Sequence, residues 1–283
     1  MLGQLWMPGA GARWKYDSST PAATPGLSVT FGVSNAEGSW VQIATSANIA
    51  QDVYGFMVEC YALNSTGYSL NATLEVGVDP AGGSSYTSIT GDLLVGASVG
   101  SATQGAGATY YFPLFIKSGS SVAVRGSTSY TSGTGRVRMV FFGRPARPEL
   151  VRVGQYCEQV GAITNNVAVS FTPGNGAEGS WASLGTTTRP CWWAQLCVGH
   201  NTTAMTAVHT YVDLAVGDGT NYDIIIENYS LYGNTAEYLL RNPIANLYGG
   251  HWEIPAGATL YVRGWCHTTV VSGWNARAVL VGG

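Results

Sequence analysis

One pentapeptide occurs twice in this chain, about half the chain length apart. AEGSW occupies Ala36–Trp40 and again Ala177–Trp181. The residues before it also match, because Val29–Phe31 reads VTF and Val169–Phe171 reads VSF. Matches in the same order indicate an internal repeat, and a repeat constrains the fold more than any other feature of a sequence.

Two further pairs of positions continue the repeat. Ile116–Gly126 (IKSGSSVAVRG) corresponds to Ile254–Gly264 (IPAGATLYVRG), and Arg138 and Arg277 stand in step in the last strand-like segment of each half. The offset between the halves is nearly constant from the first match to the last. The sequence therefore predicts two copies of one domain.

Both copies have the pattern of β-strands. Polar and apolar residues alternate in short segments rich in Val, Thr, Tyr and Ile, and Gly, Asn, Ser and Pro separate these segments. Examples are Ser69–Val78, Ser121–Ser127, Arg136–Phe142, His209–Val216 and Thr259–Trp265. Short strands at regular spacing predict an all-β fold, namely two tandem duplicated antiparallel β-sandwich domains of a jelly-roll-like kind.

The domain boundaries follow from the repeat and from the prolines. We expect the sandwiches to span residues 27–143 and 150–283. Residues 144–149 contain Pro145 and Pro148, which hold a short linker extended. Residues 1–26 show no strand pattern, and we expect an irregular N-terminal arm that lies on a neighbouring subunit.

The composition limits the possible partners. Charged residues make up 10% of the chain, against about 25% in an average soluble protein. The formal net charge is −3 and Lys and Arg form no cluster, which argues against nucleic-acid binding. A surface of Ser, Thr, Asn, Gly and Tyr meets little charge repulsion when it packs against other molecules. A secreted lectin-like domain would share this composition and is the alternative.

The first residues do not resemble an export signal. MLGQLWMPGAGARW has no basic segment before its apolar part, and Pro8 interrupts that part. No segment approaches the roughly 20 apolar residues of a membrane helix. We expect synthesis in the cytoplasm without a signal peptide, and no membrane insertion.

The cysteines do not suggest disulfides or a metal site. Their number is odd and their positions do not match between the halves: Cys60, Cys157, Cys191, Cys197 and Cys266. The even spacing of Cys191 and Cys197 predicts that they share one strand face. Zinc binding with His200 or His267 is an alternative, but the spacing is not that of a zinc knuckle. We expect structural thiols and no metal.

Catalytic motifs are missing from the sequence. All four histidines lie in the second half, and no nucleophile elbow, phosphate loop or zinc-protease motif occurs. Asp218 and Asp223 could offer ligands to calcium, but an Asp-Gly turn explains them more simply. We expect a protein that is not an enzyme and has no cofactor.

Six residues of the repeat carry charge or a large aromatic ring. They are Glu37, Trp40, Arg125, Glu178, Trp181 and Arg263. One interpretation is a ligand site present twice, and the other is a structural signature. We favour the structural one. In it, Trp40 and Trp181 fill the core at a strand start, while each Glu is held by backbone amides or by an Arg.

Aromatic residues offer a second kind of functional site. Trp and Tyr present a rigid face with a polar edge, which suits sugar rings and protein interfaces. The segment Asn228–Gly250 is a Tyr-rich insertion relative to the first half. The candidate interface or glycan contacts are Trp6, Trp192, Tyr229, Tyr232, Tyr238 and Tyr248.

In these Gly-, Ser-, Thr- and Tyr-rich strands, in the twin segments Ile116–Gly126 and Ile254–Gly264, and in its tandem organisation, the chain resembles virion structural proteins of tailed bacteriophages. The resemblance is to head decoration, collar or tail-associated proteins built of β-sandwiches. It implies a non-enzymatic role on a phage particle, with copies of the chain and other virion proteins as partners. It also implies a closed homo-oligomer, with a trimer as the expected arrangement.

Two alternatives stay open at this point. A carbohydrate-binding or host-adsorption module would use the aromatic loops of the second domain, and a virion protein could also bind a host surface glycan. An enzyme is the third class, and the missing motifs make it the weakest.

Overall fold

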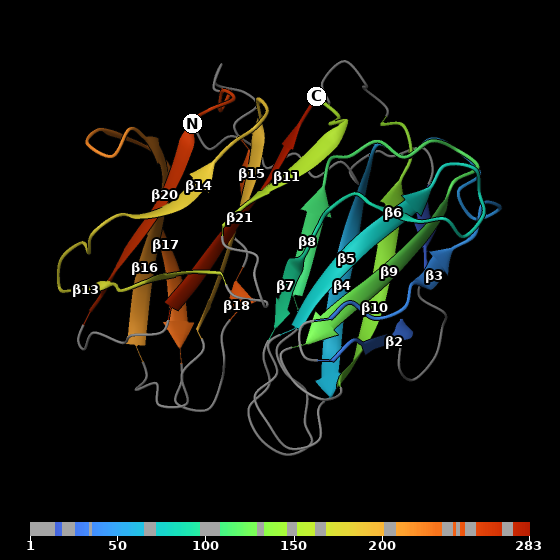
Figure 1. The fold of residues 1–283 in the computed structure, drawn as a ribbon, viewed down its shortest axis with the longest axis horizontal. Coiled ribbons are helices and arrows are strands. Elements are labelled where there is room, and N and C mark those ends of the chain that lie inside the picture. The colour runs from blue at the N-terminus through green and yellow to red at the C-terminus, as the bar shows by residue number, and fades with distance from the viewer. Residues whose placement is uncertain are drawn as a thin grey trace.

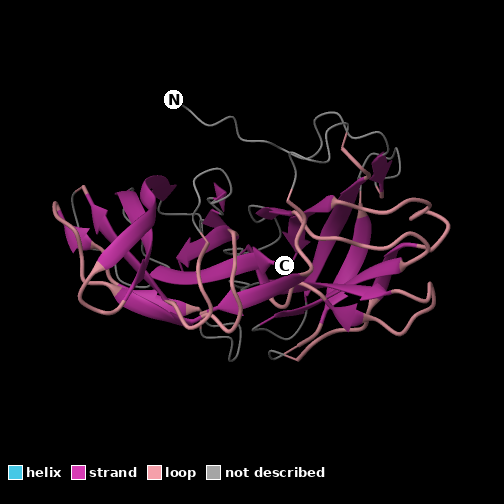
Figure 2. Cartoon of the chain, turned by 90° about the horizontal axis from the view of Figure 1, so that it is seen from above, coloured by secondary structure: helices cyan, strands magenta, loops and turns pink. Residues whose placement is uncertain are grey.

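The computed structural model describes most of the chain. The described residues are 15–18, 26–33, 36–64, 72–96, 108–128, 133–145, 152–161, 168–200, 208–233, 240–241, 244–246, 253–267 and 274–283. All regular structure in these ranges is β-strand, and Figures 1 and 2 show two groups of strands side by side. Within these ranges, no helix has both the length and the apolar character needed to cross a membrane.

The first half is a sandwich of two sheets. One sheet has the order β1-β10-β4-β8, with β2 also paired to β10. The other has the order β3-β9-β5-β6, with β7 also paired to β5. The strands are β1 (Lys15–Asp17), β2 (Leu27–Phe31), β3 (Val41–Ala44), β4 (Gly55–Asn64), β5 (Ala72–Asp79), β6 (Thr87–Ser88), β7 (Leu93–Gly96), β8 (Ala108–Phe112), β9 (Ser121–Thr128) and β10 (Gly133–Phe142).

The second half is built in the same way. One sheet has the order β11-β21-β15-β18, with β12 paired to β21 and β19 to β15. The other has the order β13-β20-β16-β17, with β14 paired to β20. The strands are β11 (Tyr156–Val160), β12 (Val169–Phe171), β13 (Gly174–Asn175), β14 (Ala182–Thr186), β15 (Trp193–His200), β16 (Val208–Gly217), β17 (Tyr222–Gly233), β18 (Leu240–Arg241), β19 (Ile244–Asn246), β20 (Thr259–Cys266) and β21 (Trp274–Gly282).

The two sandwiches share their strand order and much of their register. β3, β9 and β5 of the first half pair as β14, β20 and β16 do in the second. Arg125 is opposite Glu75 in the first pair of long strands, and Arg263 is opposite Asp213 in the second. The fold is therefore two tandem antiparallel β-sandwiches with the same topology, as the repeat predicted. The exact domain boundaries stay a prediction.

One repeated glycine has a clear backbone reason. Gly119 and Gly257 stand two residues before β9 and β20, with φ of 79° and 83°. Each is the third residue of a tight turn, which is closed by a bond from the Ser120 amide to the Lys117 carbonyl in the first half and from the Ala258 amide to the Pro255 carbonyl in the second, both 3.3 Å. Because such a turn needs a positive φ at its third residue, the sequence keeps Gly there in both halves.

The expected irregular N-terminal arm includes a strand. Lys15–Asp17 forms β1, which pairs antiparallel with β10. Tyr16 stacks on Phe141 at 5.9 Å, and Arg138 Nε donates to Asp17 Oδ1 at 3.0 Å. Three residues are too few to show the alternation of a strand in the sequence, and the residues of β10 that hold this strand are far away in the chain. The expectation of an irregular arm was therefore wrong for these three residues.

The two sandwiches are in direct contact. The Trp193 ring lies 6.0 Å from the Phe112 ring, and Trp193 belongs to the same buried cluster as the core of the first half. The Gly154 amide donates to the Pro113 carbonyl at 2.7 Å, and Gln159 Nε2 donates to the Thr90 carbonyl at 2.9 Å. Apolar packing and backbone bonds thus fix the halves against each other. Residues 146–149 of the predicted linker are not among those described.

An arginine lies at the centre of this contact. Arg277 of β21 is 0% exposed, and its Nη1 donates to the carbonyl of Asp92 in the first half. Burial lowers the pKa of Arg277, and the nearby Asp92 counteracts part of this effect. The outer face of the sheet β11-β21-β15 is therefore an interface rather than a solvent-exposed surface.

Candidate functional site

The repeated pentapeptide forms a loop that crosses close to the neighbouring strand in both halves. The Gly38 amide donates to the Gly126 carbonyl of β9, and the Gly179 amide donates to the Gly264 carbonyl of β20, both at 2.9 Å. A Cβ on Gly38 would come within 2.9 Å of the Thr30 carbonyl oxygen, and one on Gly179 within 2.7 Å of the Thr172 carbonyl oxygen. Only glycine allows this approach, which explains the G of AEGSW.

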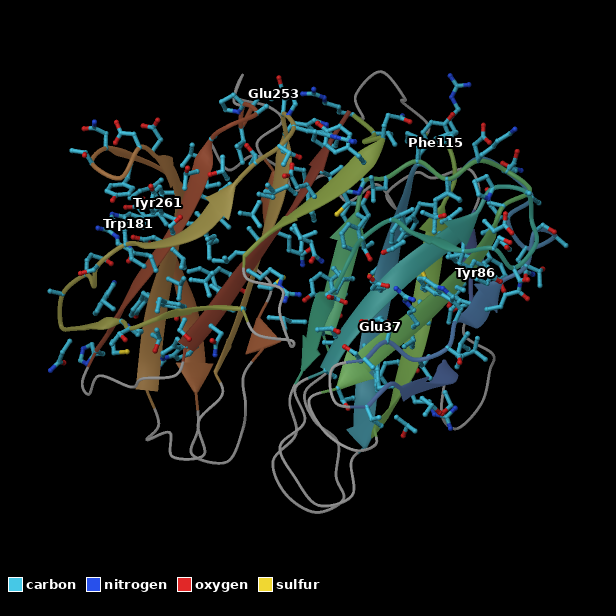
Figure 3. All side chains as sticks on the ribbon, in the orientation of Figure 1. Glu37, Tyr86, Phe115, Trp181, Glu253 and Tyr261 are labelled. Atoms are coloured by element: carbon cyan, nitrogen blue, oxygen red, sulfur yellow. The ribbon has the colours of Figure 1, made fainter. Side chains whose placement is uncertain are left out.

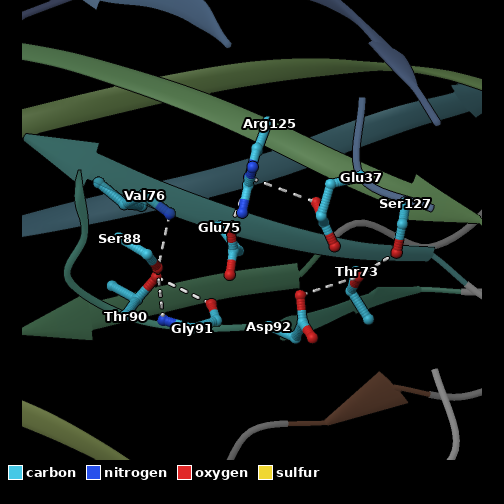
Figure 4. Close-up of polar contacts among 10 residues, drawn as sticks. All are labelled: Glu37, Thr73, Glu75, Val76, Ser88, Thr90, Gly91, Asp92, Arg125 and Ser127. Carbon is cyan, nitrogen blue, oxygen red and sulfur yellow. Dashed lines mark hydrogen bonds and ion pairs between the residues drawn. The ribbon is translucent and has the colours of Figure 1, made fainter. Parts of the chain in front are cut away.

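Arg125 connects the loop to the sheet in the first half. Its Nε lies 2.6 Å from Glu75 Oε2 on β5 and 3.6 Å from Glu37 Oε2 in the loop. Its guanidinium carbon lies 4.5 Å from the centroid of the Trp40 ring. Figure 4 shows Arg125 between the two carboxylates. The E and the W of the pentapeptide therefore meet the same guanidinium, which is attracted both to carboxylates and to the ring face.

The second half repeats this arrangement. Arg263 Nε lies 2.9 Å from Asp213 Oδ2 on β16 and 3.3 Å from Glu178 Oε2 in the loop. The guanidinium carbon lies 4.4 Å from the centroid of the Trp181 ring. We call this arrangement the brace: Glu37, Trp40, Glu75 and Arg125 in the first half, and Glu178, Trp181, Asp213 and Arg263 in the second.

The tryptophans of the brace do not fill the core, and that prediction was wrong. Both are half-buried on the outer face of their sheet, where the arginine also lies. The Trp40 ring covers Gly77, whose Cβ, if present, would be 2.6 Å from it. Trp181 stacks on Tyr222 with the ring centroids 4.7 Å apart (Figure 3 labels Trp181). The arginine points away from the core, and its attraction for the ring keeps the tryptophan there too.

A third carboxylate, that of Asp92, lies near Glu37 of the first brace. Burial raises the pKa of Glu37 to about 7, and repulsion by Asp92 and Glu75 adds to the shift, while Arg125 opposes it. Thr73 Oγ1 lies 3.5 Å from Asp92 Oδ1, and Figure 4 shows Asp92 on the same side of the sheet as Glu37 and Glu75. Glu37 therefore releases its proton near neutral pH instead of in the acidic range.

The second brace has a different environment. Burial raises the pKa of Glu178, Asp213 and Glu227 contribute, and Arg263 opposes the shift. Asp213 Oδ1 accepts a bond of 2.7 Å from the Asn228 amide, so this buried carboxylate is bound on both oxygens. Asn228 has a positive φ of 48°, which asparagine tolerates better than most residues.

The outer face around the second brace is aromatic. Tyr211 and Trp265 stack at 4.3 Å, and Tyr222 meets Tyr261 edge-on at 5.1 Å. Trp265 Nε1 donates to Asn228 Oδ1 at 3.0 Å. All four rings are half-buried, and Figure 3 shows Trp181 and Tyr261 close together on this face.

The matching face of the first half has Tyr86 against Trp40, with the ring centroids 5.7 Å apart, but small polar residues beside the brace. Thr73 corresponds to Tyr211, and Ser127 corresponds to Trp265. Thr73 and Ser127 lie opposite each other, are buried and share a hydrogen bond of 2.8 Å. The halves thus share the brace but differ in what surrounds it.

The predicted contact aromatics lie partly outside the described residues. Trp192 is 2% exposed, and Arg152 lies over its ring at 5.2 Å, so it is not available to an external partner. Tyr229 on β17 packs against the second core. The backbone of Tyr232 belongs to β17, but its side chain is not described. Trp6, Tyr238 and Tyr248 lie outside the described residues.

The cysteines are free thiols. Burial raises the pKa of Cys60 to about 12 and that of Cys197 to about 11, so both are protonated at neutral pH. Cys191 and Cys197 do not share a face, contrary to the prediction. Cys191 precedes β15 and packs in the second core, whereas Cys197 packs in the cluster at the contact between the halves.

No group of three or more His, Cys, Asp or Glu side chains suited to a metal ion occurs among the described residues. Asp218, considered as a calcium ligand, instead accepts bonds from the amides of Thr220 and Asn221 at 2.8 and 2.7 Å. These bonds lower its pKa and form the turn between β16 and β17. The Asp-Gly segment is therefore a turn in the structure.

Sequence reasoning missed two acidic residues of the braces, Glu75 and Asp213, and one beside the first brace, Asp92. Glu75 and Asp213 stand at matching positions of the repeat, in LEVGV and VDLAV. Because they differ in type, a search for identical residues passed over them, although the constant offset could have found them. Asp92 has no such signal, since its position near Glu37 depends on the path of the chain between β6 and β7.

No family model matches this chain, and no curated protein matches it. Among solved structures, it is similar to the STIV MCP, with 8% identity over 95% of this chain and 96% of that chain, and a TM-score of 0.41. It is also similar to PNGase F, a glycosylasparaginase from Flavobacterium meningosepticum, with 11% identity, 95% and 96% coverage and a TM-score of 0.39.

A third similar structure is the CBM22-1–CBM22-2 tandem domain of Paenibacillus barcinonensis Xyn10C, with 11% identity, 94% and 89% coverage and a TM-score of 0.27. Likenesses this distant assign neither a family nor a function to the chain.

Proposed function

We propose that the chain is a non-enzymatic structural protein of a virus particle, which assembles with copies of itself and with other virion proteins. The observation that carries the proposal is the use of the repeated arginines. Arg125 and Arg263 each attach a loop to its own sheet, and Arg277 attaches one sandwich to the other. These three arginines stabilise contacts within the sandwiches and between them.

The rest of the surface suits close packing. With 10% charged residues, the chain covers itself largely with uncharged polar groups. Desolvating a hydroxyl costs less than desolvating an ammonium or a carboxylate, so such surfaces pack together with little penalty. The resemblance to tailed-phage virion proteins supports a finer version, in which the protein decorates or cements the head, neck or tail. Its place would then be the virion.

Two measurements test this proposal. Mass photometry and electron microscopy of the full chain are expected to show a closed oligomer, which is the usual form of a homomeric protein. Co-sedimentation with purified particles is expected to show binding. A chain that stays monomeric at high micromolar concentration and also ignores particles would contradict the proposal.

A second candidate is glycan binding. The half-exposed rings of Tyr211, Tyr222, Tyr261 and Trp265 on one outer face favour it, because aromatic rings pack against the C–H faces of sugars. A glycan array with the full chain tests it. Selective binding that Trp265→Ala abolishes and Trp40→Ala leaves intact would promote this candidate above the first.

A further inference from the structure

One strand of the second half differs from every other strand at the edge of a sheet. β17 is 12 residues long and pairs with β16 along one side. No described strand pairs with its other side. The other edge strands, as described, are two to five residues long. Proteins keep free edges short because unpaired amides and carbonyls attract further strands, so an edge of this length without a partner among the described strands can accept an added strand.

The first part of β17 is also exposed through its side chains. Ile224 is 41% exposed, one of the few large apolar side chains at the surface of the described residues. Ile224 on β17 lies opposite Ala215 on β16, and Ala215 in turn lies opposite Tyr261 on β20. Because residues opposite each other in antiparallel strands point to the same face, Ile224 extends the aromatic outer face to the edge of the sheet.

The charge of β17 indicates the kind of partner. Tyr222–Gly233 contains Asp223 and Glu227, both exposed, and no Lys or Arg. Two copies of β17 placed side by side would bring these carboxylates together, which opposes self-pairing. An extended apolar segment with a positive charge fits better.

The chain itself contains such a segment. Residues 1–14 carry Arg13 and no acidic residue, and their first seven include Leu2, Leu5, Trp6 and Met7. Pro8 has no amide hydrogen to donate, so continuous pairing would end before it. The segment leads into β1, which belongs to the first half, whereas β17 belongs to the second.

We propose that the free edge of β17, at Tyr222–Ile226, binds residues 1–7 of a second copy of this chain as an added β-strand. The apolar side chains of that segment would cover Ile224, and Arg13 would lie in the field of Asp223 and Glu227. This inference rests on the proposed self-assembly and names the surface that carries it.

A photo-crosslink tests the contact directly. A benzophenone amino acid replaces Ile224 in the full chain, and isotopically light and heavy chains are mixed before irradiation. We expect cross-links from position 224 to residues 1–14, with light-to-heavy pairs among them. The same probe at Phe115, which is 37% exposed in the first half, is the control and should not capture this segment.

Other cross-links would overturn the proposal. Capture only within one chain would show that the arm folds back on its own β17. Capture of β17 by β17 would show edge-to-edge pairing, and capture of neither would show that this edge is free.

Sedimentation velocity separates this contact from assembly in general. Ile224→Lys, and separately the deletion of residues 1–14, should each raise the dissociation constant of the oligomer by at least about tenfold. Phe115→Lys should not, and circular dichroism should show that all variants stay folded. An oligomer that both changes leave intact would refute the docking site but not the proposed self-assembly. A monomeric full chain that does not bind particles would refute both.

Discussion

Arg138 and Arg277 occupy the same position in the two sandwiches, but they have opposite environments. Arg138 pairs with Asp17 and Glu59, and its side chain is 29% exposed. The register places Cys197 opposite Arg277 and Gln159 opposite Val279, two residues further along β21. Arg277 is 0% exposed at the contact with the first half. The same sheet face is thus open to solvent in one copy and covered in the other.

This difference shows how a duplicated domain acquires an internal interface. Two carboxylates around Arg138 form ion pairs that are best left near water, and their hydrogen bonds raise its pKa. Around Arg277 the carboxylates are replaced by neutral side chains, and the carbonyl of Asp92 from the other half accepts its hydrogen bond. Changing the neighbours, and not the arginine, converts an exposed face into a docked one.

The largest effect is expected from removing the buried arginine. Arg277→Ala leaves the Asp92 carbonyl without this donor and opens space between the halves, so we expect a loss of about 3 kcal/mol or more in the free energy of unfolding. Arg138→Ala, the matched control, should cost about 1 kcal/mol or less, because its ion pairs are partly exposed. Urea denaturation measures both, and equal losses would contradict the comparison.

A second difference concerns the residue under each brace tryptophan. Gly77→Ala places a Cβ about where the Trp40 ring lies, and we expect a loss of about 1–3 kcal/mol. Gly77 lies opposite Ala123 in the first half, and Ala215 lies opposite Tyr261 at the matching positions of the second half. The residue that corresponds to Gly77 is therefore already an alanine. Ala215→Gly should cost about 1–2 kcal/mol, through the greater backbone freedom of glycine and the loss of one buried methyl group. Thermal unfolding of the two variants, with the Trp fluorescence of each, checks this prediction.

The smallest effect is a pH dependence. The pKa of Glu37 rises from 4.5 to about 7 on folding. The folded protein therefore keeps a proton that the unfolded chain releases, so stability falls as pH rises from about 4.5 to about 7 and stays reduced above that range.

Glu37→Gln should flatten this slope and make the variant more stable than the native chain above neutral pH, by about 1 kcal/mol because the group is partly exposed. Glu178→Gln should act in the same direction. Thermal midpoints measured across this pH range check the prediction, and an unchanged slope in the Glu37→Gln variant would refute it.

The sequence predicted the features that are repeated and missed those that are not. The nearly constant offset of AEGSW and of the VRG segments was enough to predict two similar sandwiches, because several matches in the same order indicate a duplicated domain. The alternation in β10 and β21 predicted which residues share a face, but it could not tell what covers that face. The burial of Arg277 therefore could not be predicted from the sequence of its own strand.

The error over Trp40 and Trp181 has a similar cause. A tryptophan before a strand is typical of a core residue, and only the position of Arg125 or Arg263 on the neighbouring strand turns it outward. Lys15–Asp17 was missed because three residues show no period, and its pairing depends on β10, far away in the sequence.

The central claim is that the repeated braces hold the fold and do not bind a ligand. The double variant Glu75→Gln, Asp213→Asn removes the closest carboxylate charge from each brace. We expect its free energy of unfolding to fall by about 1–3 kcal/mol per site, because the hydrogen bonds of Arg125 and Arg263 to these side chains lose their charged acceptors. Particle binding and oligomer size of the folded variant should be unchanged. Unchanged stability together with lost binding to particles or to a glycan would contradict the claim and make the braces a ligand site present twice.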